Sequence, residues 1–231
     1  MRIAGAGTIS GGIYGTVTVA GAGTVRGDVD ALAFKVGGAV DVIGSVKATS
    51  IVVNGTATFD GNVDGGAVVI NGTADVRGHF KGDSLKVSGT ASIDGPVTAQ
   101  RVDIRGTTKI GGDVEAEVFD ARGVFSIGGL LNAGTISIQL YGGADARDIG
   151  GETIEVREGK PWAFLPFLGE RNLTADIIEG DTVYLENTRA KVVRGANVTI
   201  GAGCQIDLVE YTGSLTGSAG ITTSRKVEPT A

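Results

Sequence analysis

The sequence has little of what disulfide-linked, fibrous and membrane-spanning proteins need. Its single cysteine, Cys204, excludes an internal disulfide. Four prolines stand against forty glycines, and those glycines follow no Gly-X-Y period, which excludes a collagen-like chain. The sequence shows no secretory signal and no apolar run of about 18 residues. We therefore expect a cytoplasmic protein.

Positive charge is also missing in the form that nucleic acid requires. Twenty Lys and Arg against 26 Asp and Glu give a formal charge of −6, and the chain contains no basic block. The sequence therefore lacks the electrostatic attraction for phosphate backbones on which nonspecific nucleic-acid binding depends. Nucleic acid is excluded as an expected partner.

Residues that commonly perform catalysis are equally scarce. The only histidine, His79, stands at an outward position of the repeat described below, which indicates a surface residue. Asp60 and Asp94 could form a carboxylate pair, but Arg77 occupies the same repeat position between them, which favours charge pairing. No Ser-His-Asp set is present, and no helix is predicted after the glycine-rich stretch GAGTVRG. The sequence predicts no catalytic site, metal, cofactor or nucleotide.

What the sequence has instead is a regular internal repeat. Written in rows of 17 from Val17 to Thr135, every row carries glycine at its fifth and eleventh positions. Large apolar residues dominate columns one, three, nine and thirteen, and column fifteen holds only alanine or glycine. The two glycine columns are Gly21, Gly38, Gly55, Gly72, Gly89, Gly106 and Gly123, and Gly27, Gly44, Gly61, Gly78, Gly95, Gly112 and Gly129.

These columns predict the shape of one row. Columns one and three, seven and nine, and thirteen and fifteen each pair residues two apart, which face the same way in a β-strand. Three short strands make one triangular coil, and successive coils stack in register as an all-β, parallel β-helix with 17-residue coils. We expect the two glycines at corners, where a positive φ angle has no steric cost without a Cβ atom.

The period is interrupted once and changes near the ends. Before Val17 a further coil keeps Ile3, Ile9 and Ile13 in phase. Towards the other end, Val183 and Ile200, and Val192 and Val209, return to a spacing of 17. The predicted organisation is a main β-helix over 1–156, an insertion at 157–172, further coils over 173–211 and a polar tail at 212–231.

The ends and the insertion are the candidate functional surfaces. An end coil presents unpaired backbone groups over an apolar interior, which makes it the adhesive part of a solenoid. The insertion, REGKPWAFLPFLGERN, is expected to form a lid over the helix or to dock on a membrane surface or partner protein. Candidate polymerisation residues are Ile3, Ile9 and Ile13 at one end and Val198, Ile200 and Ile206 at the other, and candidate docking residues are Trp162, Phe164, Leu165, Phe167 and Leu168.

Several stretches resemble a known family. They are the coil sequences NGTATFDGNV and SGTASIDGPV, and the longer stretches FSIGGLLNAGTISIQLYGGADARDIGGETIEV at 125–156 and ADIIEGDTVYLENTRAKVVRGANVTIGAGCQIDLVEY at 175–211. These are similar to the bactofilins, polymer-forming cytoskeletal proteins of bacteria, and to longer Gram-positive members in particular. The resemblance implies a right-handed β-helix, polymerisation through the helix ends without nucleotide, and a scaffolding role in cell shape, envelope or motility. The sequence lacks the proline-rich arms and N-terminal membrane-targeting segment of many members.

The leading hypothesis is a non-enzymatic cytoplasmic scaffold whose main partner is a second copy of itself. Association with other proteins or with a membrane surface would come through the insertion. Two alternatives stay open: a carbohydrate-active or acyl-transferring enzyme on the same fold, and a monomeric adaptor that docks through residues 161–168. Filaments formed without nucleotide would distinguish the first hypothesis from the other two.

Overall fold

The computed structural model describes residues 1–159 and 170–228, and its regular structure is entirely β-strand. The chain divides into two compact units, unit 1 from Met1 to Gly112 and unit 2 from Asp113 to Ala231. Within each unit the strands pair in parallel with strands of the next coil. This confirms the prediction of an all-β, parallel β-helix.

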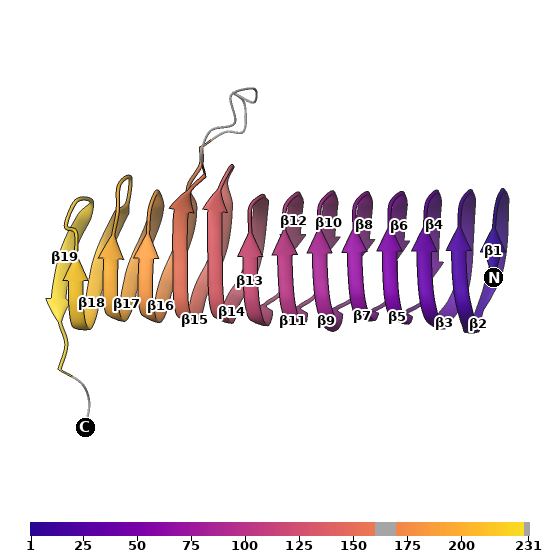
Figure 1. The fold of residues 1–231 in the computed structure, drawn as a ribbon, viewed down its shortest axis with the longest axis horizontal. Helices are drawn as coiled ribbons and strands as arrows, with labels where there is room; N and C mark the ends of the chain where they lie inside the picture. The colour runs from indigo at the N-terminus through magenta and orange to yellow at the C-terminus, as the bar shows by residue number, and fades with distance from the viewer. Residues whose placement is uncertain (160–169, 229–231) are drawn as a thin grey trace. The chain divides into compact units, whose positions relative to one another are not determined.

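Unit 1 consists of short strands that stack coil upon coil, drawn from indigo to magenta in Figure 1. Residue 51 pairs with residue 68, 68 with 85 and 85 with 102, so partners in neighbouring coils keep the predicted spacing of 17. The strands are β1 (Arg2–Ile3), β2 (Ala6–Val19), β3 (Ala22–Val36), β4 (Ala39–Ile43), β5 (Val46–Val53), β6 (Thr56–Phe59), β7 (Val63–Ile70), β8 (Thr73–Val76), β9 (Phe80–Val87), β10 (Thr90–Ile93), β11 (Val97–Ile104) and β12 (Thr107–Ile110).

The core of unit 1 follows the predicted columns. Each coil turns three pairs of side chains inward, and the two members of a pair are separated by one outward residue. Large side chains alternate with alanine or glycine, so the narrow interior is filled without overpacking. In one representative coil the buried residues are Val46, Ala48, Ile51, Val53, Ala57 and Phe59.

The corner glycines of unit 1 are required by close contact between coils. A Cβ atom on Gly55 would lie 1.9 Å from the carbonyl oxygen of Gly38 in the preceding coil. In the second column, a Cβ atom on Gly61 would lie 2.7 Å from the carbonyl carbon of Gly44. The positive-φ glycines described in this unit are Gly12, Gly27 and Gly44. The expectation that positive φ explains the columns is therefore wrong at most corners, because the constraint is the distance to the neighbouring coil.

A ladder of side chains satisfies backbone donors along one corner of unit 1. Asp28 Oδ1 accepts from the Ser45 N–H at 2.8 Å, and Ser45 Oγ accepts from the Asn62 N–H at 3.1 Å. Asn62 Oδ1 in turn accepts from the His79 N–H at 3.1 Å. The next residue at this corner, Pro96, has no N–H, so His79 has no such donor to satisfy.

Unit 2, drawn from magenta to yellow in Figure 1, is built from longer strands. The strand β15 ends at Glu158 and β16 begins at Leu173. The insertion predicted at 157–172 therefore begins two residues later than expected, because Arg157 and Glu158 pair with β14. Part of the stretch expected to be a polar tail forms the end of β18 and all of β19, which pair in parallel. The strands are β13 (Val114–Ala121), β14 (Val124–Leu140), β15 (Ala144–Glu158), β16 (Leu173–Leu185), β17 (Thr188–Ile200), β18 (Gln205–Thr216) and β19 (Ile221–Lys226).

The coil spacing varies in unit 2. Ile136 pairs with Ile154, one residue beyond the spacing of unit 1. Ile154 pairs with Val183, at a much larger spacing, because that coil contains the insertion. Val183 then pairs with Val198, and Val192 pairs with Leu208. The expected stacking of Val183 on Ile200 and of Val192 on Val209 is therefore wrong.

Shorter corners explain the smaller coils of unit 2. In unit 1, three residues separate the inward-facing Val53 from Ala57, and three separate Phe59 from Val63. In unit 2, two residues separate the buried Leu185 from Thr188, and Leu185 pairs with Ile200 in a coil two residues shorter than those of unit 1. The glycine columns do not continue there because the corners that they serve are shorter.

Candidate functional site

The first coil of unit 1, residues 1–16, forms one end of that unit and contains three predicted contact residues. Ile3 pairs with Val19 and is buried, with 6% of its surface exposed. Ile9 is half-buried, and Ile13 points outward with 88% exposed. The structure therefore places Ile9 and Ile13 on accessible surface of the end coil and Ile3 inside it.

Tyr14 shapes the interior of this end coil. Its ring lies beside Gly12, where a Cβ atom would be 3.8 Å from three of the ring and hydroxyl atoms. The phenol hydroxyl donates a hydrogen bond of 2.7 Å to the carbonyl oxygen of Ser10. The ring is thus held through its hydroxyl, and it is half-buried.

The end coil of unit 1 carries charge only at its start, on the Met1 ammonium group and Arg2. From Ile3 to Val25 the sequence has no Asp, Glu, Lys or Arg. The Met1 ammonium group donates to the carbonyl oxygen of Thr16 at 2.5 Å. Contact through the stretch that begins at Ile3 would therefore bury apolar groups and backbone edges without removing charged side chains from water.

The last strands of unit 2 differ in both composition and packing. The predicted contact residues Val198, Ile200 and Ile206 are buried, each with at most 5% of its surface exposed. Val198 pairs with Leu215 of β18, and Ile206 pairs with Ile221 of β19. As placed, these side chains lie beneath the chain's own strands and not on the outer edge of the unit.

Ion pairs run along these last strands. Arg194 Nε lies 2.7 Å from Glu210 Oε2, and Arg225 pairs with the other oxygen of the same carboxylate. These contacts with Arg194 and Arg225 lower the pKa of Glu210 below its usual value. The C-terminal strands therefore carry charges of both signs, whereas the first coil of unit 1 has no charged side chain after Arg2.

A polar cluster lies where the chain leaves and re-enters the coils around the insertion. Tyr184 donates a hydrogen bond to Glu186, whose other carboxylate oxygen accepts from the Glu158 N–H at 2.7 Å. These bonds lower the pKa of Glu186, and the bond to Glu186 raises the pKa of the Tyr184 phenol. The Arg157 guanidinium lies 4.4 Å from the centre of the Tyr184 ring.

The second strand that flanks the insertion is fixed by arginine. Arg171 pairs with Glu158 at 3.2 Å and donates to the carbonyl oxygen of Gly159 at 3.1 Å. The docking residues proposed from the sequence lie outside the described residues. They are Trp162, Phe164, Leu165, Phe167 and Leu168.

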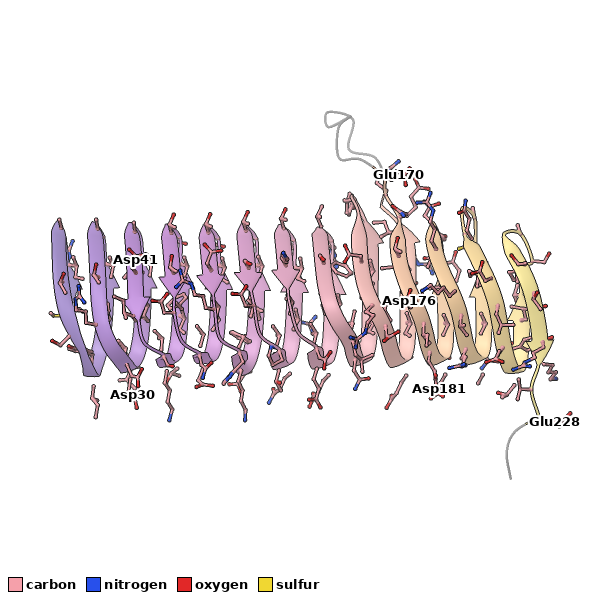
Figure 2. The ribbon with its side chains drawn as sticks, turned by 180° about the vertical axis from the view of Figure 1, so that it is seen from behind. Asp30, Asp41, Glu170, Asp176, Asp181 and Glu228 are labelled. Carbon is pink, nitrogen blue, oxygen red and sulfur yellow. The ribbon has the colours of Figure 1, made fainter. Side chains whose placement is uncertain are left out.

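Each unit has a shallow groove. In unit 1 it lies at the corner that follows the alanine and glycine residues of column fifteen, such as Ala48 and Gly65. The groove of unit 2, of about 910 Å³, is lined by Gly151, Gly180 and Gly195 and by carboxylates such as Asp181. The groove of unit 1, of about 590 Å³, runs past Asp30 and alternating lysines and aspartates. Figure 2 labels Asp30 and Asp181, whose side chains project outward from their own units.

Groups that could perform catalysis are dispersed in the described residues. His79 Nε2 lies 3.6 Å from Asp64 Oδ1 on the surface, and Arg77 pairs with Asp60 at 2.8 Å as the sequence indicated. Cys204 is buried, and burial raises the pKa of its thiol. Across residues 1–159 and 170–228, no group of three or more His, Cys, Asp or Glu side chains could hold a metal ion. Within those same ranges, no helix is long and apolar enough to span a membrane.

Comparison with known proteins identifies the repeat. Residues 51–132 match the family model of the bactofilins, which is described as polymer-forming cytoskeletal. This region of the chain is similar to a bactofilin domain. The resemblance inferred from the coil sequences is thereby confirmed, and the matched region contains coils on both sides of the boundary between units 1 and 2.

Two proteins of Bacillus subtilis are similar to this chain. The uncharacterized protein YhbE is 45% identical over 103 residues, which cover 42% of this chain and 43% of the relative. The uncharacterized protein YhbF is 48% identical over 83 residues, which cover 36% of this chain and 34% of the relative. The chain thus spans less than half the length of the curated relatives that it matches. No solved structure matches the chain.

The sequence prediction missed two features of these candidate surfaces. Tyr14 was not singled out, although an aromatic residue one coil before a column of alanine and glycine is a visible departure from the repeat. The cluster of Arg157, Tyr184 and Glu186 was also missed, because it joins residues from the two sides of the insertion. No fixed period brings those residues together.

Proposed function

We propose that this protein is a non-enzymatic scaffold subunit of the bacterial cytoplasm that assembles with further copies of itself through its end coils, without nucleotide. The observation that carries the proposal is the open first coil of unit 1 in a chain with a polymer-forming family domain. The strand β2 pairs with β3 along its length, and along its other side, among the described residues, it pairs only with the two residues of β1. Most of its outer backbone edge is therefore available to a partner.

The physical reason for assembly is the cost of leaving such an edge uncovered. A parallel stack leaves N–H and C=O groups unpaired at its last coil, and a second strand edge can satisfy them. The net charge of −6 makes copies repel one another at long range. The first coil has no acidic side chain, so that repulsion is locally weak at its surface.

Sedimentation of the purified 231-residue chain tests this function. We expect rods or filaments, visible by negative-stain microscopy, in buffer without ATP or GTP, and the same amount of pelleted protein when either nucleotide is added. Ile9→Arg should shorten or abolish the assemblies, because it places a charge on the half-buried face of the first coil. Leu32→Arg is the matched control, because Leu32 is 69% exposed on the neighbouring coil and faces outward.

Two results would contradict the proposal. Assembly that requires nucleotide would remove its central claim, and a monomer at all concentrations would favour the adaptor or enzyme alternatives. Equal loss of assembly in Ile9→Arg and Leu32→Arg would show that added charge, and not the end coil, is responsible.

A further inference from the structure

The first coil of unit 1 differs from the following coils at two neighbouring inward-facing positions. Tyr14 pairs with Ala31, Ala31 with Ala48, and Ala48 with Gly65. At the position two residues earlier, the end coil has the smaller side chain. Gly12 pairs with Val29, and Val29 pairs with a further valine. The valine–alanine pair of an interior coil is thus replaced by a glycine–tyrosine pair in the end coil.

This exchange produces a fixed aromatic surface. The ring lies beside Gly12, and its hydroxyl donates a hydrogen bond of 2.7 Å to the Ser10 carbonyl oxygen, which fixes the orientation of the ring. A ring held in this way loses little conformational freedom when a partner covers it. Tyrosines of this kind are enriched among the residues that dominate the energy of protein contacts.

The surroundings of the ring suit a second copy of the chain. The half-buried Ile9 and the exposed Ile13 belong to the same end coil, next to the backbone edge of β2. The coil has no charged side chain between Ile3 and Val25, so two copies that meet along this stretch would bring no like-charged side chains together. A strongly basic partner would find no carboxylate on this stretch.

We propose that Tyr14 is the anchor of the contact between the first coil of unit 1 and a second copy of this chain. The proposal rests on the proposed function, since it assigns the residue that gives the end coil its affinity. The ring supplies a fixed apolar contact, and the backbone edge of β2 sets the direction of the approaching strand.

Truncation of the ring tests the proposal. The critical concentration for assembly is measured by sedimentation for the wild-type chain, Tyr14→Ala, Tyr14→Phe and Ile43→Ala. We expect Tyr14→Ala to raise it about tenfold or more, and Tyr14→Phe, which keeps the ring, to change it by less than about threefold. Ile43 is the matched control, because it is an exposed apolar residue two coils away, in register with Arg26 and Ser10.

Loss of fold is controlled within the same set. The second and third coils carry alanine at this position, so Tyr14→Ala introduces a residue that the coil accommodates. The thermal unfolding midpoint of each variant is measured to confirm that the variant is folded. A second measurement varies the salt concentration. A contact that buries an uncharged surface should not weaken as NaCl is raised, whereas one that depends on ion pairs should.

The outcomes separate the two proposals. Wild-type chain that assembles with Tyr14→Ala unchanged or strengthened overturns the role of Tyr14 and leaves the proposed function standing. Wild-type chain that stays monomeric overturns both. Assembly of the wild-type chain that dissolves with added salt also overturns the anchor, because it would place charged groups in the contact.

Discussion

Units 1 and 2 build the same kind of coil with different corners. In unit 1 two corners of each coil contain three residues, one of which is a glycine. The coils lie so close together there that a Cβ atom on this glycine would collide with the backbone of the preceding coil. In unit 2 a coil can close with fewer residues and without those glycines, as the pairing of Leu185 with Ile200 shows. There Asn187 supplies the only non-glycine positive φ angle among the described residues, 46°. The glycine columns thus mark a particular corner, not the β-helix itself.

The two units also stabilise their outward groups differently. Unit 1 uses the hydrogen-bond ladder from Ser45 through Asn62 to His79 and the bond from Asn71 to Asn54 at 2.8 Å, beside a few ion pairs such as Arg77 with Asp60. Unit 2 uses ionised contacts such as Lys191 with Asp176 at 2.8 Å. We therefore expect the stability of unit 2 to depend more on pH and salt than that of unit 1.

The largest difference should come from two adjacent glycines of unit 1. A Cβ atom on Gly38 would lie 2.0 Å from the Gly21 carbonyl oxygen, whereas one on Gly37 has its nearest contact at 3.8 Å. Gly38→Ala should lower the free energy of unfolding by about 3 kcal/mol or more, because the coils must separate. Gly37→Ala should change it by no more than about 0.5 kcal/mol. Chemical denaturation followed by circular dichroism compares the two, and equal effects would show that coil contact does not explain the column.

A smaller difference should separate two members of the side-chain ladder. Asn62→Ala leaves the His79 N–H without its acceptor, at a cost of about 1 kcal/mol in unfolding free energy. His79→Ala should cost about 0.5 kcal/mol or less, because Pro96 presents no N–H to satisfy. Asn62→Asp keeps an acceptor oxygen and should recover most of the loss. If His79→Ala costs as much as Asn62→Ala, the ladder is not what stabilises this corner.

The smallest effect should be a pH dependence confined to unit 2. Because hydrogen bonds lower the pKa of Glu186 in the folded chain, its contribution is present above the usual value of 4.5 and is lost as pH falls through the lowered pKa. The wild-type chain should lose stability on acidification between about pH 5 and 3 more steeply than Glu186→Gln does. Thermal unfolding at several pH values measures the slopes, with Glu152→Gln as a control for the loss of an exposed carboxylate. Equal dependence of the unfolding temperature on pH in all three proteins would show that Glu186 does not cause the pH dependence.

Much of unit 1 could be predicted because every interior coil has the same length. A fixed period brings Ile51, Val68 and Leu85 into register, and alternation within a row gives the inward face. In unit 2 the shortening of a corner is invisible to a fixed period. Val198 and Ile200 are both apolar and both buried, so a spacing of 17 chose the wrong member of the pair as the partner of Val183.

The candidate contact surface was predicted only in outline. The sequence indicated an adhesive first coil, but a shift in register between Ser10 and Gly12 places Gly12 opposite Val29 and turns Ile13 outward. A column count shows that this coil is one residue short, but it does not show where along the coil the register changes. Val198, Ile200 and Ile206 were chosen as if the coils ended near residue 211, whereas β18 and β19 continue beyond them.

The coil that carries the insertion has a further consequence. Despite its extra length it returns Ile154 and Val183 to direct pairing, so the strands resume their alignment after the residues between Glu158 and Leu173. The coil therefore accommodates extra residues at this corner without loss of register. In the proposed filament, residues at this corner could be exchanged during evolution while the spacing of subunits is conserved.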